Sequence, residues 1–322
     1  MISVICPAKL NLGLRVLGRR PDGFHDLDGL MVGLPWFDRV DVEMDDQWTG
    51  PPNEQVDLVL SGDGQSMTLE APQGADNIVV RAAREFLGRA AESFGDFRPR
   101  VAIKLIKRIP SGTGLGGASS DAAGTLLALN GIVTESGLEP FSDDEIRDMA
   151  ACLGSDTVFF LDPEPARIQG RGERFVPAGF DVSLAVVVAV PSTRLSTAAV
   201  FALWDERRDS SGTDRNRLTV SPPGAINPCL SVSASARSGF APPPEFFEND
   251  LSDAVFELCP RAAELSRLLV GCGASVAAVT GSGAAVYGVC GDMVSARAVA
   301  AAMSRVILPG EIARAFQVGN VF

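Results

Sequence analysis

A run rich in glycine and serine, residues 110–120, most limits how this chain can fold. It holds four glycines, follows a strand-like segment at 101–109 and precedes a helix-like segment at 122–130. Glycine allows close approach to the backbone, and a helix N-terminus offers unpaired N–H groups and a partial positive charge. We therefore predict a phosphate site here. Its residues are Pro110, Ser111, Gly112, Thr113, Gly114, Leu115, Gly116, Gly117, Ala118, Ser119 and Ser120.

Other kinds of glycine loop have to be compared with this one. A Walker A loop ends in Gly-Lys-Ser or Gly-Lys-Thr, and this run contains no lysine. The spacing of Gly112, Gly114 and Gly117 matches a dinucleotide fingerprint, so an NAD site stays open as an alternative. A carboxylate is then expected about twenty residues later, and the nearest ones, Glu135 and Glu139, fall in a turn-rich segment. A tight turn without a ligand is the remaining interpretation, but four glycines exceed what a turn needs.

The composition indicates a globular chain with an acidic surface. Its 322 residues are 46% hydrophobic and 21% charged, which is enough for two packed domains. The formal net charge of -12 argues against a nucleic-acid partner, because binding to a phosphate backbone needs a basic surface. An anionic ligand would instead meet backbone N–H groups and a few placed cations. The candidates are Lys9, Lys104, Lys107 and Arg108.

The few cysteines and the single histidine limit which metals this chain could bind, and its hydropathy bears on its cellular location. The six cysteines are scattered without a C-x-x-C pair, which is typical of thiols in a reducing compartment. The single histidine argues against a zinc cluster, so any metal is expected to be Mg²⁺ that arrives with a nucleotide. No apolar stretch approaches a bilayer span, and no secretory signal is visible. We expect a cytoplasmic protein with no membrane contact.

The order of strand-like and helix-like segments predicts an α+β protein of two domains. In the first half, short strands mix with helices, one of them at 143–152 with Ser142 as N-cap and Glu145 three residues later. In the second half, strands alternate with helices as in an α/β sandwich. We place the domains at residues 1–165 and 166–322. Residues 207–245, rich in Ser, Pro, Gly and Arg, read as a flexible insertion.

Four further segments carry side chains that are unusual for an ordinary core. Lys9 and Asn11 share one face of an extended segment, although a solvated lysine is the plainer interpretation. Phe24 and His25, the only histidine, follow a turn, where a surface histidine is the usual case. Asp156 comes directly after the end of a helix and precedes an apolar stretch, so it is either buried near a cation or a helix cap. A second glycine turn at 279–284 is either a plain hairpin bend or closes on the ligand of the first loop.

Together these segments resemble the GHMP kinase superfamily, named for galactokinase, homoserine kinase, mevalonate kinase and phosphomevalonate kinase. Five motifs occur in the family's order, and the match covers most of the chain except the insertion. They lie at residues 7–12, 20–25, 109–120, 153–156 and 281–284, with a sixth similarity at 249–251. The resemblance implies a two-domain fold, with an N-terminal mixed α/β nucleotide-binding domain and a C-terminal α/β sandwich domain. It also implies ATP and Mg²⁺.

The resemblance also assigns roles to residues of this chain. Lys9 and Asp156 match the family's catalytic pair, and residues 110–120 match its nucleotide loop. The similarity is greatest to the branch that phosphorylates the 2-hydroxyl of a cytidine diphosphate-linked methylerythritol in the non-mevalonate route to isoprenoid precursors. Asn11, Phe24 and His25 match positions that meet the cytidine end of that substrate. Another acceptor, such as homoserine or mevalonate, and a non-catalytic nucleotide-binding relative remain alternatives.

Two departures from the family pattern bear on binding. Phe24 stands where tyrosine is usual, which keeps the stacking face and removes a hydroxyl. Asp121 stands where asparagine is frequent. A carboxylate beside a phosphate loop is expected to weaken ATP binding unless it caps the helix or helps to hold Mg²⁺.

Overall fold

The fold is seen in a computed structural model, which describes residues 1–50, 54–62, 71–72, 74–95, 98–179, 182–210 and 244–319. Most of the predicted insertion at 207–245, namely residues 211–243, lies outside the described residues. The contacts between residues divide the chain into two compact units. Unit 1 comprises Met1–Ala8, Trp36–Ser111 and Gly116–Asp162, and unit 2 comprises Lys9–Pro35, Gly112–Leu115 and Pro163–Phe322. The predicted domains 1–165 and 166–322 stay a prediction.

Two long strands contribute to both units. They are β1 (Ile2–Arg19) and β2 (His25–Asp45), which pair with each other. In unit 1 the second half of β2 pairs antiparallel with β4 (Arg100–Lys107), and β4 pairs parallel with β3 (Val56–Gly62). Parallel neighbours need a crossover connection. Here η2 (Gly74–Asp76) and α1 (Ile78–Phe94) supply it, and the Asn77 side chain caps α1 by accepting a 3.0 Å hydrogen bond from the Val79 N–H.

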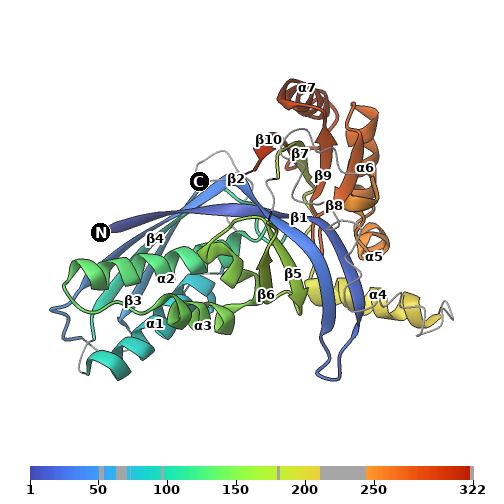
Figure 1. Cartoon of the computed structure of the whole chain (residues 1–322). Coiled ribbons are helices and arrows are strands. Elements are labelled where there is room, and N and C mark those ends of the chain that lie inside the picture. The colour runs from blue at the N-terminus through green and yellow to red at the C-terminus, as the bar shows by residue number, and fades with distance from the viewer. Residues whose placement is uncertain are drawn as a thin grey trace. The chain divides into compact units, whose positions relative to one another are not determined.

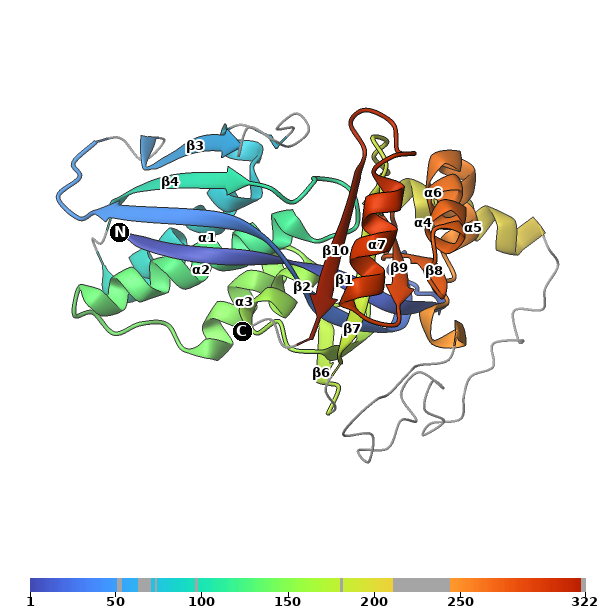
Figure 2. The same cartoon turned by 90° about the horizontal axis from the view of Figure 1, so that it is seen from above.

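Helices cover one face of the unit 1 sheet, as α1 and α2 (Gly117–Glu135) show in Figures 1 and 2. Small residues let α2 approach β1 closely, because a Cβ on Gly124 would lie 2.5 Å from the Cys6 Sγ. The helix α3 (Asp143–Leu153) begins with the predicted capping box of Ser142 and Glu145, which confirms that prediction. The short helix η3 (Ser155–Leu161) follows α3 and packs against both α2 and α3.

Unit 2 is built on an antiparallel four-stranded sheet in the order β10-β7-β9-β8. The strands are β7 (Leu184–Val190), β8 (Val276–Val279), β9 (Val286–Cys290) and β10 (Ile312–Val318). The helices α6 (Pro260–Gly271) and α7 (Met293–Met303) pack against this sheet (Figure 2). Every residue of β7 is buried, because the strand runs through the middle of this layer.

The remaining elements of unit 2 extend the first half of β2 and surround the sheet. β5 (Ala166–Gly170) pairs antiparallel with β2 and with β6 (Arg174–Pro177). The other helices are α4 (Thr197–Ser210), η5 (Pro244–Phe247) and α5 (Ser252–Leu258). Mixed helices and sheets in both units confirm the predicted α+β class. Within the described ranges, no helix is both long and apolar enough to cross a membrane.

Candidate active site

The outer part of the glycine loop, Gly112–Leu115, belongs to unit 2 and is held on two sides there. The Lys9 N–H donates to the Leu115 carbonyl oxygen at 2.9 Å, and the Ala285 N–H donates to the Thr113 carbonyl oxygen at 3.1 Å. Gly114 has a φ of +80°, and a Cβ there would lie 2.6 Å from the Thr280 carbonyl oxygen. The turn between β8 and β9 is therefore more than a hairpin bend, because its backbone packs directly against the loop.

Lys9 and Asn11 lie together against this same turn. The Lys9 Nζ donates to the Asn11 Oδ1, and the Asn11 N–H donates to the Thr280 Oγ1 at 2.9 Å. Gly281 leaves room for the pair, since a Cβ there would lie 3.3 Å from the Lys9 Nζ and 3.2 Å from the Asn11 Oδ1. Lys9 is only 4% exposed, so its interpretation as a solvated lysine is wrong.

Asn249 holds the turn in place, and the sequence pointed to it only through the similarity at 249–251. Its Nδ2 donates to the carbonyl oxygens of Val279 at 3.0 Å and of Gly281 at 2.8 Å. Its Oδ1 accepts a 2.9 Å bond from the Leu251 N–H. A buried amide thus fixes the turn that contacts both Lys9 and the loop.

The inner part of the loop, from Gly116 onward, belongs to unit 1 and forms the first turn of α2. The helix begins five residues before the predicted start, because Gly116 takes a left-handed conformation with a φ of 75° that turns the chain into the helix. No side chain caps this end, and the first N–H groups of a helix have no partner within it. The Ser120 Oγ is buried and has no hydrogen-bond partner in the described structure. This end of α2 therefore keeps the donors that an anion requires.

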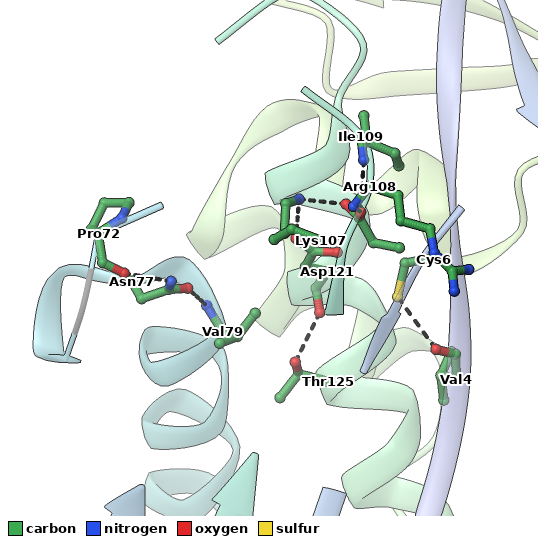
Figure 3. A network of polar contacts seen from close by, with 11 residues as sticks. Val4, Cys6, Pro72, Asn77, Val79, Lys107, Arg108, Ile109, Asp121 and Thr125 are labelled. Carbon is green, nitrogen blue, oxygen red and sulfur yellow. Dashed lines mark hydrogen bonds and ion pairs between the residues drawn. The ribbon is translucent and has the colours of Figure 1, made fainter. Parts of the chain in front are cut away.

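Beside the start of α2, a buried cluster joins Lys107 to two carboxylates (Figure 3). The Lys107 Nζ donates to the Asp121 Oδ2 at 2.7 Å and also to the Asp38 Oδ2. The other oxygen of Asp38 accepts the N–H of Arg108 and, at 2.8 Å, the N–H of Ile109. The prediction that Lys107 meets an anionic ligand is therefore wrong, because two carboxylates already neutralise its ammonium group. The signal for Asp38 was an acidic residue inside the apolar strand segment at 34–42.

Burial and mutual charge shift the pKa values in this cluster. Burial raises the pKa of the Asp121 carboxyl to about 8, with the charge of Lys107 opposing the rise and that of Asp38 adding to it. Burial alone lowers the pKa of Lys107, but the charges of Asp121 and Asp38 outweigh it and raise the pKa overall. Burial raises the pKa of the nearby Cys6 thiol, and the same two carboxylates raise it further. The Asp121 carboxyl thus accepts a hydrogen bond from the Lys107 ammonium group, and it does not cap α2.

Asp156 lies near the start of η3 in unit 1. The preceding helix ends at Leu153 with Gly154 as its C-cap, as the sequence predicted. Asp156 is half-buried and sits inside η3, whose own N-cap is Gly154 without a side-chain bond, so the helix-cap interpretation is wrong. The next residue, Thr157, is fully buried, and its Oγ1 has no hydrogen-bond partner among the described residues.

Phe24 and His25 follow the hairpin turn between β1 and β2, in unit 2. The His25 ring is 9% exposed and stacks on Phe201 at a centroid distance of 4.7 Å. Its Nε2 lies 2.9 Å from the Asp205 Oδ1, and its ring meets the edge of Trp204 at 5.6 Å. His25 is therefore not a surface histidine. Phe24 is 55% exposed, with the Arg171 guanidinium 4.9 Å above its ring.

Three α4 residues around His25 were not predicted from the sequence. They are Phe201, Trp204 and Asp205, which lie at i, i+3 and i+4 of a helix and so share one face. The available signal was the spacing of these two aromatic residues and one acidic residue, which matches one face of a helix. Nothing in the sequence indicated that this face would meet the turn after β1.

Both halves of the chain match sequence models of one kinase superfamily. Residues 77–162 match the GHMP kinases N terminal domain, and residues 235–307 match the GHMP kinases C terminal domain. A homoserine kinase structure from Cytophaga hutchinsonii aligns over 99% of this chain and 95% of its own, with a TM-score of 0.65 and 16% identity. The two domain matches therefore make the chain a GHMP kinase, and the homoserine kinase structure has the same fold.

Curated relatives show to which family within the GHMP kinase superfamily the chain belongs. The 4-diphosphocytidyl-2-C-methyl-D-erythritol kinase of Symbiobacterium thermophilum is 34% identical over 90% of this chain and 91% of its own length. The enzyme of the same name from Solidesulfovibrio magneticus is 35% identical over 88% of this chain and 86% of its own. A crystal structure of 4-(cytidine 5'-diphospho)-2C-methyl-D-erythritol kinase covers 99% of this chain and all of its own, with a TM-score of 0.70 and 31% identity. The chain belongs to the 4-diphosphocytidyl-2-C-methyl-D-erythritol kinase family, and as a kinase it is a phosphotransferase that uses ATP.

Proposed function

We propose that this chain transfers the γ-phosphoryl group of ATP to the 2-hydroxyl of 4-diphosphocytidyl-2-C-methyl-D-erythritol, in the cytoplasmic synthesis of isoprenoid precursors. Family membership supports the reaction, since relatives that align over nine-tenths of the chain carry that name. The observation that carries the proposal is the buried Lys9, fixed by Asn11 and joined through its backbone to the glycine loop. These bonds fix Lys9 beside the outer part of the proposed phosphate loop.

The loop is proposed to bind the phosphates of ATP through its backbone. Phosphoryl transfer has a loose transition state, so positioning and charge stabilisation contribute most of the catalysis. The left-handed glycines and the uncapped start of α2 provide N–H donors without a side-chain cation. This role covers Pro110 to Ser120, the run predicted from the sequence.

Mg²⁺ is proposed to accompany the nucleotide. Among the described residues, no group of three His, Cys, Asp or Glu side chains is placed to hold a metal ion. Mg²⁺ usually takes one or two protein oxygens together with phosphate oxygens and waters. The hydroxyl of Ser119 or Ser120 is the proposed protein oxygen, and the Oγ of Ser120 has no hydrogen-bond partner among the described residues. Bound there, Mg²⁺ would neutralise charge on the phosphates.

Asp156 and Lys9 are proposed to act on the acceptor. The Asp156 carboxylate would accept or orient the proton of the 2-hydroxyl as the oxygen attacks. The Lys9 ammonium would stabilise the charge that develops on the transferred group. The hydrogen bond from Lys9 to Asn11 limits the rotamers of the lysine, so its charge is already oriented.

The cytidine end of the acceptor is proposed to bind at Phe24 and His25, with Asn11 as a further substrate contact. A cytosine has two π faces and a hydrogen-bonding edge, which suit an aromatic ring and an imidazole. Phe24 has an exposed ring for stacking, and Asp205 together with Phe201 fixes the His25 ring. Acceptors such as homoserine and mevalonate have no base, so these residues favour the cytidyl substrate over them.

The experiment is a measurement of ADP release by the purified chain with ATP and Mg²⁺ and a panel of acceptors. The panel contains the cytidyl methylerythritol substrate, its analogue without the base, homoserine and mevalonate. We expect the highest kcat/KM with the cytidyl substrate and a large loss with the base-free analogue. A preference for homoserine or mevalonate would reject the proposed acceptor. Absence of ADP with every acceptor, despite measurable ATP binding, would favour a non-catalytic relative.

A further inference from the structure

The two ends of the glycine loop are connected by the buried cluster of Asp38, Lys107 and Asp121, which the proposed chemistry does not use. Lys107 is the last residue of β4, before the loop, and Asp121 lies in α2, just after it. All three side chains are less than a tenth exposed. The cluster therefore lies within unit 1, and Figure 3 shows Lys107 and Asp121 directed toward each other.

On the strand side, Asp38 fixes the direction in which the chain leaves β4. Its carboxylate accepts the backbone N–H groups of Arg108 and Ile109 as well as the ammonium group of Lys107. Hydrogen bonds to a charged acceptor are stronger than those between neutral groups. The two residues that lead into the loop are thus held by one carboxylate on β2.

On the helix side, Asp121 ties the start of α2 to the same lysine. The Asp121 Oδ2 accepts from the Lys107 Nζ at 2.7 Å. Gly117, the first residue of α2, is so close that a Cβ there would lie 3.0 Å from the Ile109 Cγ2 and 3.2 Å from the Lys107 Nζ. The strand end and the helix start are therefore in direct contact, and the ion pair crosses that contact.

We propose that Lys107 and Asp121 are positioning residues that hold the start of α2 against the end of β4 and so preset the loop N–H groups for phosphate. This inference rests on the proposed function, which supplies the phosphate ligand. A loop with four glycines loses much conformational freedom when it becomes ordered, so fixing its ends before binding lowers the cost of binding.

Stability alone accounts poorly for such a cluster. Replacing a buried ion pair by apolar side chains of similar volume is often neutral or even stabilising. The hydrogen bond from Lys107 to Asp121 differs from an apolar contact in its directionality, because it weakens steeply when the angle at the hydrogen departs from linear. Directionality is what a loop needs if its N–H groups are to converge on one point.

The test compares two variants at Asp121. Asp121→Ala removes the tie to α2 but leaves the ion pair of Lys107 with Asp38, so no buried charge is left unpaired. Asp121→Asn keeps an oxygen that can accept from the Lys107 Nζ. The measurements are the dissociation constant for ADP, the KM values for ATP and the acceptor, and amide hydrogen exchange of residues 110–120 in the ligand-free chain. Arg100→Ala, which removes an exposed ion pair with Asp57 in the same unit, is the matched control.

We expect Asp121→Ala to raise the dissociation constant for ADP about tenfold, equivalent to about 1.4 kcal/mol, with the acceptor KM unchanged. Exchange of the loop amides should accelerate in this variant and stay near wild type in Asp121→Asn and in Arg100→Ala. Unchanged ADP binding and unchanged loop exchange in Asp121→Ala would overturn the proposal, as would equal impairment of the Ala and Asn variants. Amide exchange is measured without ligand, so it tests this inference even if the chain has no kinase activity. Absence of ADP formation would reject the proposed function alone.

Discussion

The backbone N–H of Lys9 donates a 2.9 Å hydrogen bond to the carbonyl oxygen of Leu115. This bond joins β1 to the outer part of the glycine loop within one compact unit. The side chain of the same lysine bonds to Asn11, against the second glycine turn. The proposed catalytic ammonium group and part of the proposed phosphate loop are therefore fixed relative to each other by the backbone.

Replacing Lys9 should affect the chemical step more than binding. We expect Lys9→Met to lower kcat by about a hundredfold to a thousandfold, the usual effect of removing one group that stabilises transition-state charge. The apolar stem of methionine fits the buried site, so the fold should persist. Steady-state kinetics check this, with circular dichroism for folding. Arg81→Met, at an exposed position on α1, is the control and should leave kcat unchanged.

Gly114 should tolerate no side chain. In Gly114→Ala the new methyl group would meet the Thr280 carbonyl oxygen at 2.6 Å and would force a φ of +80° on alanine. We expect weaker ADP binding in calorimetry and a lower Tm. Gly137→Ala is the matched control, because Gly137 has a φ of +77° with nothing within 4 Å of a new Cβ. It should lose only about 1 to 2 kcal/mol of stability from the left-handed conformation, with normal ADP binding.

Phe24 should contribute to binding of the acceptor but not of ATP. Loss of base stacking costs about 1 to 3 kcal/mol, so Phe24→Ala should raise the acceptor KM about fivefold to a hundredfold. The KM for ATP should stay the same. Leu17→Ala, another exposed apolar residue near the end of β1, is the comparison and should change neither KM. If Phe24→Ala raises the KM for ATP as much as the KM for the acceptor, the result would argue against the proposed base site.

Glu311 gives a pH dependence of stability whose sign can be worked out. Burial tends to raise the pKa of its carboxyl, but bonds from the Arg261 side chain and the Leu308 N–H outweigh burial and lower the pKa below 4.5. The Arg261 Nε and Nη2 donate to its two oxygens at 2.8 and 2.7 Å. A lowered folded-state pKa contributes stability above the unfolded pKa, and this contribution is lost as the pH falls through the folded pKa.

Urea unfolding of the wild type and of Glu311→Gln from pH 7 down to pH 3 tests this assignment. The wild type should be the more stable chain at pH 7, and the difference should shrink below about pH 4.5. Glu264→Gln removes the exposed partner of the same arginine and should show a smaller difference throughout. A constant difference between wild type and Glu311→Gln over this range would contradict the role of the carboxylate.

Much of the fold was predictable because local signals agreed with it. The capping box at Ser142 placed α3, and the glycine run placed a strand, a loop and a helix in the correct order. The start of α2 was predicted five residues late, because Gly117 to Ser120 look like loop residues in the sequence. Only the left-handed turn at Gly116 shows that they are already helical.

Site residues could be predicted where the local sequence pattern identified them. Contacts with residues distant in the sequence could not be predicted. Lys9 and Asn11 were identified as candidates from their alternation along a strand, but the Thr280 hydroxyl that orders Asn11 was not. Lys107 was misread as a ligand cation because the two carboxylates that neutralise it come from β2 and α2. The sequence shows Asp38 as an acidic residue among apolar ones, but it does not show which distant cation that carboxylate pairs with.

The measurement that tests the account most directly is the kcat of Asp156→Asn with ATP and the cytidyl methylerythritol acceptor. The amide keeps the size of the carboxylate in η3, so the variant should fold with the Tm of the wild type. We predict a loss in kcat of about a hundredfold to ten-thousandfold, the range for removing a positioned proton acceptor. Asp162→Asn, at the exposed end of the same short helix, should retain full activity. Near-normal turnover by Asp156→Asn would contradict the proposed site.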